Sequence, residues 1–325
     1  MPTAKAVVYR EYGSPDVLHC EDVEKPSPGD DEVLIRIRAA AANPLDYHLM
    51  SGAFLMRPMT GLRKPKTTRP GVDFAGEVEA IGRNVARFRP GDAVYGALRG
   101  AFAEYGCALE TRLALKPANL TFEQAAAIPV AGLTALQGLR DKGRLQPGQN
   151  VLINGAAGGV GTFAVQIAKS FGASVTGVCS TRNLDLVRSL GADHVVDYTR
   201  DDFTRSAQRY DLIFDCVGNH PFSACRRVMP PKGTFVAIGV RPGGRLMGPL
   251  PYLLKVFMSS PFVSQRVVFF IAKITTDDLA ALNELIEANK VTPIVDRRYP
   301  LCETPEAIRY LKEGHARGKV VITVP

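Results

Sequence analysis

The sequence lacks closely spaced cysteine pairs and any cluster of cysteine and histidine at metal-ligand spacing. Structural zinc sites need pairs such as Cys-x-x-Cys, and disulfide frameworks are typical of short secreted chains. Neither pattern occurs among the six cysteines, which are Cys20, Cys107, Cys179, Cys216, Cys225 and Cys302. We therefore expect reduced thiols and no structural metal.

A secretory signal is also missing. The chain opens MPTAKAVVYREYG, where apolar residues alternate without an apolar core or a small-residue cleavage site. This predicts a cytoplasmic protein. The most apolar stretch, residues 249–273, is interrupted by Lys255, Ser259 and Arg266 before the roughly 20 residues that a membrane span needs. We expect ordinary core there, with a peripheral membrane contact or a dimer interface as the alternatives.

Charge of one sign is not concentrated along most of the chain. The net charge is +8, but 40 basic residues are interleaved with 32 acidic ones, which predicts a solvated surface and no nucleic-acid partner. Residues 57–69 are the exception, with five cations and no acid. This segment is either a solvated loop or a place that attracts phosphates or an anionic surface.

At 325 residues and 46% apolar, the chain is expected to divide into two domains. Residues 1–118 contain short strands separated by glycine and proline, typical of an antiparallel β-rich domain. Residues 119–272 alternate strands and helices, typical of an α/β doubly wound parallel sheet, with a sixth strand expected near 265–271. Residues 273–325 are predicted to return to the first domain.

The segment VLINGAAGGVGTFAVQIAK carries the first chemical signal. Gly158 and Gly161 stand between a strand and a helix, and Ala156 stands where the first glycine of a Gly-x-Gly-x-x-Gly motif would be. Gly158 lets the backbone approach a pyrophosphate, Gly161 permits close helix–strand packing, and the helix N-terminus attracts phosphates. This context predicts a dinucleotide site rather than a plain tight turn.

The end of the next strand distinguishes NADPH from NADH. NAD-binding sites usually carry an acid about 20 residues after the glycines, which binds the ribose hydroxyls. This chain reads CSTRN at 179–183 and has no acid before Asp185. Hydroxyls and the Arg182 guanidinium suit a 2′-phosphate, so the sequence predicts NADPH. A solvent-exposed Arg182 at a helix start is the alternative.

Together these motifs resemble the quinone oxidoreductase branch of the medium-chain dehydrogenase/reductase superfamily. The likeness covers nearly the whole chain and rests on AAGGVGTFAVQIAK, STRN, LGADHVVDY, DCVG, GLTAL and GHARGKVVITV. The resemblance implies a GroES-like catalytic domain, a Rossmann domain and commonly a homodimer. It implies cofactor contacts from Asn43, Thr134, Gly158, Gly159, Val160, Gly161, Ser180, Arg182, Tyr198, Val217, Gly218, Gly239, Val240 and Arg241.

Two zinc ligands of the related alcohol dehydrogenases are replaced here. Those enzymes carry Cys-x-x-Asp-x-His and Gly-His-Glu segments, whereas this chain has Asn43 in place of the cysteine and Val72 in place of the histidine. Three protein ligands for a catalytic zinc therefore cannot be assembled, and we expect no metal. Alcohol oxidation is disfavoured, because the alkoxide needs a Lewis acid or an equivalent.

The remaining chemistry is hydride transfer to a quinone or an α,β-unsaturated carbonyl, which conjugation activates. Asn43, Tyr47 and His48 are the candidate hydrogen-bond donors to the acceptor oxygen. His48 stands where the zinc enzymes carry a relay histidine; a structural or solvated histidine is the alternative, and water is another proton source. The competing function is an NADPH-binding sensor or membrane-associated regulatory protein with little turnover.

Overall fold

The computed structural model describes residues 2–52, 57, 61–239 and 264–325. The chain divides into two compact units. Unit 1 comprises residues 1–130, 273–287 and 293–325, and unit 2 comprises residues 131–272 and 288–292. Compared with the division expected from the sequence, residues 119–130 lie in unit 1 and residues 288–292 lie in unit 2.

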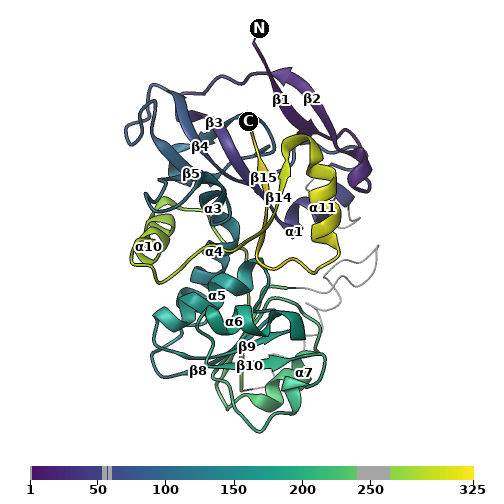
Figure 1. Cartoon of the computed structure of the whole chain (residues 1–325), viewed down its shortest axis with the longest axis vertical. Helices are drawn as coiled ribbons and strands as arrows, with labels where there is room; N and C mark the ends of the chain where they lie inside the picture. The colour runs from purple at the N-terminus through teal and green to yellow at the C-terminus, as the bar shows by residue number, and fades with distance from the viewer. Residues whose placement is uncertain (1, 53–56, 58–60, 240–263) are drawn as a thin grey trace. The chain divides into compact units, whose positions relative to one another are not determined.

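Unit 1 is built on a mainly antiparallel sheet (Figure 1). Its described strands follow the order β14-β15-β3-β4-β5-β7, with β6 also paired to β3, while β1 and β2 form a separate antiparallel pair. The β-rich architecture predicted for the first domain is thus confirmed. The strands are β1 (Thr3–Val8), β2 (His19–Glu24), β3 (Glu32–Ala42), β4 (Asp73–Ile81), β5 (Ala93–Ala97), β6 (Tyr105–Leu109), β7 (Leu113–Leu115), β14 (Val295–Pro300) and β15 (Lys319–Thr323).

Among the described residues, four helices belong to unit 1: α1 (Pro44–Ser51), α3 (Phe122–Ala126), α10 (Thr276–Glu287) and α11 (Thr304–Lys312). Helix α3 ends before Pro129, where α4 (Pro129–Gln137) begins. Proline has no N–H to continue the preceding helix, so it starts a new one.

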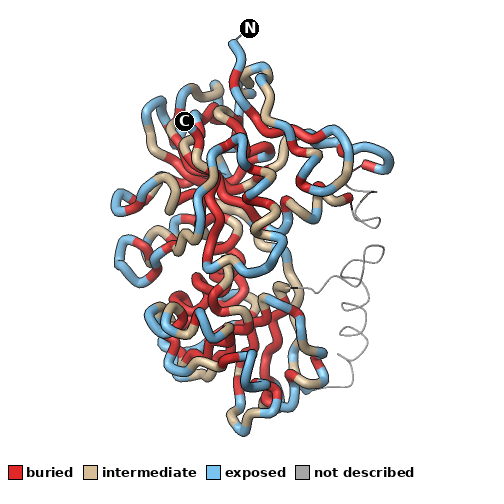
Figure 2. The backbone as a smooth tube through the Cα atoms, turned by 45° about the vertical axis from the view of Figure 1, so that its right-hand side comes forward, coloured by how far each residue is buried: buried red, intermediate tan, exposed pale blue. Residues whose placement is uncertain are grey.

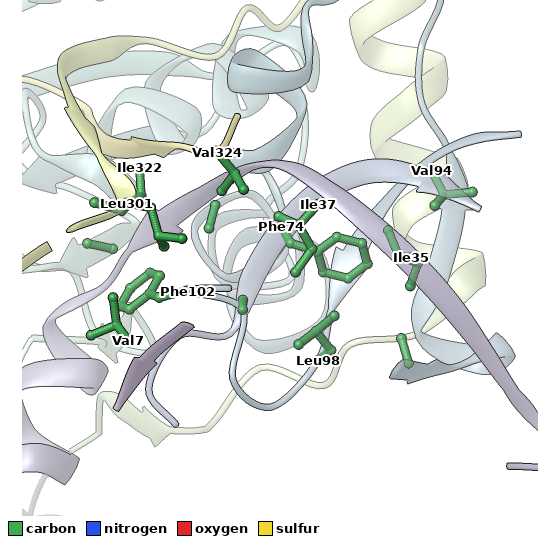
Figure 3. Packing of buried hydrophobic residues seen from close by; sticks show 14 of the residues in the cluster. Val7, Ile35, Ile37, Phe74, Val94, Leu98, Phe102, Leu301, Ile322 and Val324 are labelled. Carbon is green, nitrogen blue, oxygen red and sulfur yellow. The ribbon is translucent and has the colours of Figure 1, made fainter. Parts of the chain in front are cut away.

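Alternating side chains of β3 form the core of unit 1. Val33, Ile35 and Ile37 are all fully buried, as expected for one face of a strand with a period of two residues. Figure 3 shows Ile35 and Ile37 beside Phe74 of β4. Each such side chain contributes about 1.5–3 kcal/mol on burial, so this face fixes the register of the sheet.

Unit 2 contains a six-stranded parallel sheet in the order β10-β9-β8-β11-β12-β13. This confirms the doubly wound α/β prediction. Figure 2 shows the strands as a buried interior, and the central strand β11 is buried at every position. The elements are β8 (Asn150–Asn154), α5 (Gly159–Ser170), β9 (Ser174–Cys179), α6 (Leu184–Ser189), β10 (His194–Asp197), β11 (Leu212–Asp215), α7 (Phe222–Cys225), β12 (Thr234–Ala237) and β13 (Arg266–Phe269).

Strand β13 confirms the sixth strand expected near 265–271. Part of the apolar stretch 249–273 is therefore a sheet strand, and residues 249–263 lie outside the described part of the chain. No helix within the described ranges is both long and apolar enough to cross a bilayer.

Cys20 and Cys302 form a disulfide, so the expectation of reduced thiols is wrong for these two residues. Cys20 lies in β2, Cys302 lies in the short helix η9 (Leu301–Glu303), and their Cα atoms are 5.1 Å apart. A separation of 282 positions hid the pair, because it is packing of the chain ends and not sequence spacing that brings them together. The described cysteines that stay free are Cys107, Cys179, Cys216 and Cys225.

We expect Cys20→Ser to lower the free energy of unfolding by about 2–4 kcal/mol, because the cross-link restricts the unfolded chain. Denaturant unfolding with and without reductant checks this. Reductant should destabilise the wild-type protein and the Cys107→Ser control, but not Cys20→Ser. A wild-type protein that does not respond to reductant would contradict the cross-link.

Candidate functional site

The predicted cofactor residues of unit 2 gather at the carboxyl ends of its parallel strands. β8 is followed by the glycine loop, β9 by Ser180 and Arg182, β10 by Tyr198, β11 by Val217 and Gly218, and β12 by Gly239. These five strands are consecutive in the sheet, and the chain order reverses between β8 and β11, where ligands bind in such folds. Thr134 is buried in α4, and Val240 and Arg241 lie outside the described residues.

Gly158 and Gly161 of the loop are glycines for different physical reasons. A Cβ on Gly161 would lie 2.1 Å from the Gly155 carbonyl oxygen, so the turn between strand and helix leaves no space there. A Cβ on Gly158 would meet the same oxygen at 3.4 Å, an ordinary contact, and Gly158 has φ −82°. The fold itself therefore requires Gly161 and not Gly158. An open Gly158 before the first turn of α5, whose N–H groups have no intrahelical partners, fits a pyrophosphate.

A buried aspartate shapes the turn after β11. The Asp215 Oδ1 accepts hydrogen bonds from the Val217 and Gly218 N–H groups at 3.0 and 2.9 Å and from the Asn154 Nδ2 at 2.8 Å. Burial raises the pKa of Asp215, and these donors oppose that rise. Gly239 packs against this turn, since its Cβ would lie 2.2 Å from the Cys216 carbonyl carbon. Val217, Gly218 and Gly239 thus form one assembly.

An acid does lie beside the end of β9, although it comes from another strand. Asp197 of β10 accepts from the Thr181 Oγ1 at 2.5 Å and from the Thr199 Oγ1 at 2.8 Å. These hydroxyls hold its carboxylate in place and lower its pKa. Arg182 and Tyr198 are exposed beside this carboxylate. Asp197 could not be placed here from the sequence, because only the pairing of β10 with β9 brings it beside Cys179.

A network of buried charges surrounds Asn43 in unit 1. Asn43 follows β3, while Lys319 begins the neighbouring β15 and Asp73 begins β4 on the other side. The Lys319 Nζ donates to the Asn43 Oδ1 at 2.6 Å and to the Asp73 Oδ2 at 3.2 Å, and the Asn43 Nδ2 donates to the Asp73 Oδ2 at 2.9 Å. Lys319 is 3% exposed and Asp73 is fully buried. The Asn43 amide is therefore engaged inside the protein.

The same asparagine begins helix α1. The Asn43 N–H donates to the Asp46 Oδ2 at 2.8 Å, which completes a capping box. Burial raises the pKa of Asp46 to about 7, and the neighbouring Asp73 adds to the rise. Asp46 therefore orients this turn. Within the described ranges, no three histidine, cysteine or acidic side chains are grouped as a metal ion requires.

Tyr47 and His48 lie in the middle of α1, and His48 begins its last turn. Their ring centroids are 5.6 Å apart, and the Lys312 Nζ of α11 lies 5.1 Å from the Tyr47 ring centroid. The His48 side chain reaches solvent, but its surroundings desolvate the ring enough to lower its pKa. The lowered pKa favours the neutral imidazole, which offers an N–H donor.

Comparison with known proteins assigns the chain to a family. Residues 29–118 match the alcohol dehydrogenase GroES-like domain, and residues 190–322 match the zinc-binding dehydrogenase domain. A chloroplastic quinone oxidoreductase from Triphysaria versicolor is 35% identical, covering 98% of both chains. The chain belongs to the quinone oxidoreductase family. A second relative is the NADPH-dependent alkenal/one oxidoreductase of Arabidopsis thaliana, which is 36% identical over 98% of this chain and 79% of that protein.

Solved structures agree with this assignment. The quinone oxidoreductase of Coxiella burnetii has a TM-score of 0.87 and 30% identity, and each chain is covered completely. This quinone oxidoreductase family member therefore combines the GroES-like and Rossmann folds that the resemblance implied. One matched domain is named for zinc binding. In this chain, however, Asn43 and Val72 stand where the zinc enzymes have a cysteine and a histidine ligand.

The names of the relatives contradict the cytoplasmic location expected from the sequence. Related quinone oxidoreductases of Triphysaria versicolor and Spinacia oleracea are chloroplastic, as is the alkenal/one oxidoreductase. The expectation rested on a missing secretory signal, and organelle transit peptides have a different composition that this test does not detect.

The two glycines of the loop provide a matched pair of variants. Gly158→Ala should leave the free energy of unfolding within about 0.5 kcal/mol of wild type but weaken NADPH binding by roughly tenfold or more, because the methyl group occupies ligand space. Gly161→Ala should destabilise the protein by about 1–3 kcal/mol through overpacking. Thermal unfolding and fluorescence titration separate the two effects. Equal destabilisation by both variants would refute this assignment.

Lys319→Met should lower the free energy of unfolding by about 3–5 kcal/mol, because it leaves the buried Asp73 carboxylate without its cation. Adding Asp73→Asn should recover part of this loss. The matched control is Arg83→Met, which breaks the exposed pair with Asp30 and should change stability by at most about 1 kcal/mol. Denaturant unfolding measures all three, and a Lys319→Met variant as stable as the control would disprove the role of the network.

Proposed function

We propose that this protein is an NADPH-dependent oxidoreductase that transfers hydride to a quinone or an α,β-unsaturated carbonyl without zinc. The observation that carries the proposal is the alignment of nearly the whole chain with relatives named quinone oxidoreductase and NADPH-dependent alkenal/one oxidoreductase. The replaced ligand positions Asn43 and Val72 support a reaction without a catalytic metal.

The carboxyl edge of the unit 2 sheet would hold the cofactor. Gly158 to Gly161 would face the pyrophosphate, Ser180, Arg182 and Tyr198 the 2′-phosphate, and the assembly of Val217, Gly218 and Gly239 the remainder. NADPH supplies a hydride when bound. The protein supplies orientation and, through Arg182, a charge opposite to that of the extra phosphate.

Helix α1 would serve the acceptor. Tyr47 and His48 can each donate a hydrogen bond to the oxygen on which negative charge develops. We assign Asn43 a positioning role instead of a catalytic one, because its amide already binds Lys319 and Asp73. The proton that the acceptor finally takes up comes from water, passed through His48 or delivered directly.

Homodimer formation is part of the proposal. The unit 2 sheet ends at β13, whose outer edge has no partner strand among the described residues. An edge of this kind is suited to pairing with a second copy. Light scattering of the purified protein tests this point.

The Arg182→Ala variant tests the cofactor assignment. Wild-type protein should bind NADPH at least tenfold more tightly than NADH, a difference of about 1.4 kcal/mol, and the variant should lose this preference while its NADH affinity stays unchanged. Fluorescence titration measures both affinities. Arg188→Gln is the matched control, since Arg188 is an exposed cation of α6 beyond the strand ends.

Addition of a quinone and of an enone to the NADPH complex then tests the reaction. Oxidation of NADPH by either acceptor supports the proposed enzyme, and the acceptor identifies the substrate class. NADPH binding with no turnover of either acceptor would instead favour the NADPH sensor.

A further inference from the structure

The amino end of the unit 2 sheet carries a groove that the proposed enzyme does not use. Its volume is about 320 Å³, and three cations line it: Arg144, Lys232 and Arg266. The cofactor residues follow the carboxyl ends of the same strands. The five residues of β8 separate the two ends by roughly 16 Å.

Two of these cations have a backbone conformation that is unfavourable for residues with a Cβ atom. Arg144 has φ +52° and Lys232 has φ +68°, in the left-handed region where glycine is favoured. The third described non-glycine residue with positive φ is Asn289, whose side chain tolerates this conformation. Both cations with left-handed backbone within the described ranges therefore line one groove. Strained backbone of this kind concentrates at functional sites.

The turn that carries Lys232 shows what the strain implies. The Gly233 N–H donates to the Pro230 carbonyl at 3.1 Å, so Pro230–Gly233 is a tight turn whose third residue has positive φ. Glycine or asparagine is the residue that such a position normally takes. A lysine there costs folding free energy that glycine would save, which points to a use for the charge.

The groove has a rigid base and an excess of positive charge. Thr234 and Arg266 are paired at the start of β12 and β13, and the Thr234 N–H donates to the Asp211 carbonyl at 2.8 Å. Asp211 is the acid among the lining residues, and its Oδ2 accepts from the Asn150 N–H at 2.9 Å. None of the three cations has an ion-pair partner among the residues that the structure describes.

A second basic groove of unit 2 lacks these properties. It is lined by Arg205, Arg209 and Arg227, but Arg205 pairs with Asp202 and Arg209 donates to the Arg227 carbonyl. None of its arginines is among the described residues with positive φ. The comparison sets the groove of Arg144, Lys232 and Arg266 apart from an ordinary solvated surface.

We propose that Arg144, Lys232 and Arg266 form a second anion-binding site, which takes a small phosphate-bearing molecule with at least two negative charges. Guanidinium groups recognise phosphate oxygens through paired, charge-assisted hydrogen bonds, and the lysine adds a point charge. The groove volume suits a small ligand. The site rests on unit 2 alone and does not depend on the reaction proposed above.

Isothermal titration with inorganic pyrophosphate tests the site in the full chain saturated with NADPH, so that the cofactor's own phosphate contacts are occupied. Wild-type protein should bind one pyrophosphate per chain. Lys232→Gly and Arg266→Gln should each weaken binding at least tenfold. Lys232→Gly should also melt at the same or a higher temperature than wild type, because it removes the backbone strain.

Two controls separate the site from general effects of charge and strain. Arg188→Gln removes one exposed cation of unit 2 outside the groove, and Asn289→Gly relieves a left-handed residue without a change of charge. Both should bind pyrophosphate as wild type does. No binding at millimolar pyrophosphate, or equal weakening by Arg188→Gln and Lys232→Gly, would overturn the proposal. A second titration without NADPH shows whether pyrophosphate binding at the groove depends on the cofactor. A failure of this site can then be told apart from a failure of the proposed NADPH-dependent enzyme.

Discussion

A carboxylate that is taken out of water must be given hydrogen-bond donors, and this constraint organises both units. In unit 1, Asp73 receives them from Asn43, Lys319 and the Val130 N–H. In unit 2, Asp215 receives them from Asn154 and the turn that follows β11. Asp73 begins β4 beside Asn43, which directly follows β3, and Asp215 ends β11 beside Asn154, the last residue of β8. The loops that carry the candidate site take their shape from these two buried groups.

Much of the fold was predictable because its signals are local. The glycine loop, the strand after it and the sixth strand at 266–269 each show their pattern within a few residues. The first unit was predictable as β-rich for the same reason. Brief or half-exposed strands such as β2, β7 and β14 have a weak pattern, so the sequence alone does not indicate their positions.

The candidate site was predictable in part. The residues at the carboxyl ends of the strands could be named, since parallel strands align those ends. The partners of Asn43 could not, because Lys319 and Asp73 meet it only through the pairing of β15, β3 and β4. The same limit applies to Cys20 with Cys302 and to Asp197 with Thr181. The sequence indicates which residues are candidates for the site, whereas the order of the strands in the sheet decides which of them are in contact.

The discontinuity of unit 1 has a consequence for synthesis on the ribosome. Domains fold as units while the chain emerges, with earlier residues first. Most of unit 2, residues 131–272, emerges before β15 exists, so its parallel sheet can close while β3 still lacks a neighbour on one side. Asp73 cannot pair with Lys319, and Cys20 cannot form its disulfide with Cys302, until the C-terminal residues have been made. Unit 1 is thus begun first and completed last. Until β15 is made, the exposed edge of β3 is what a chaperone would have to shield.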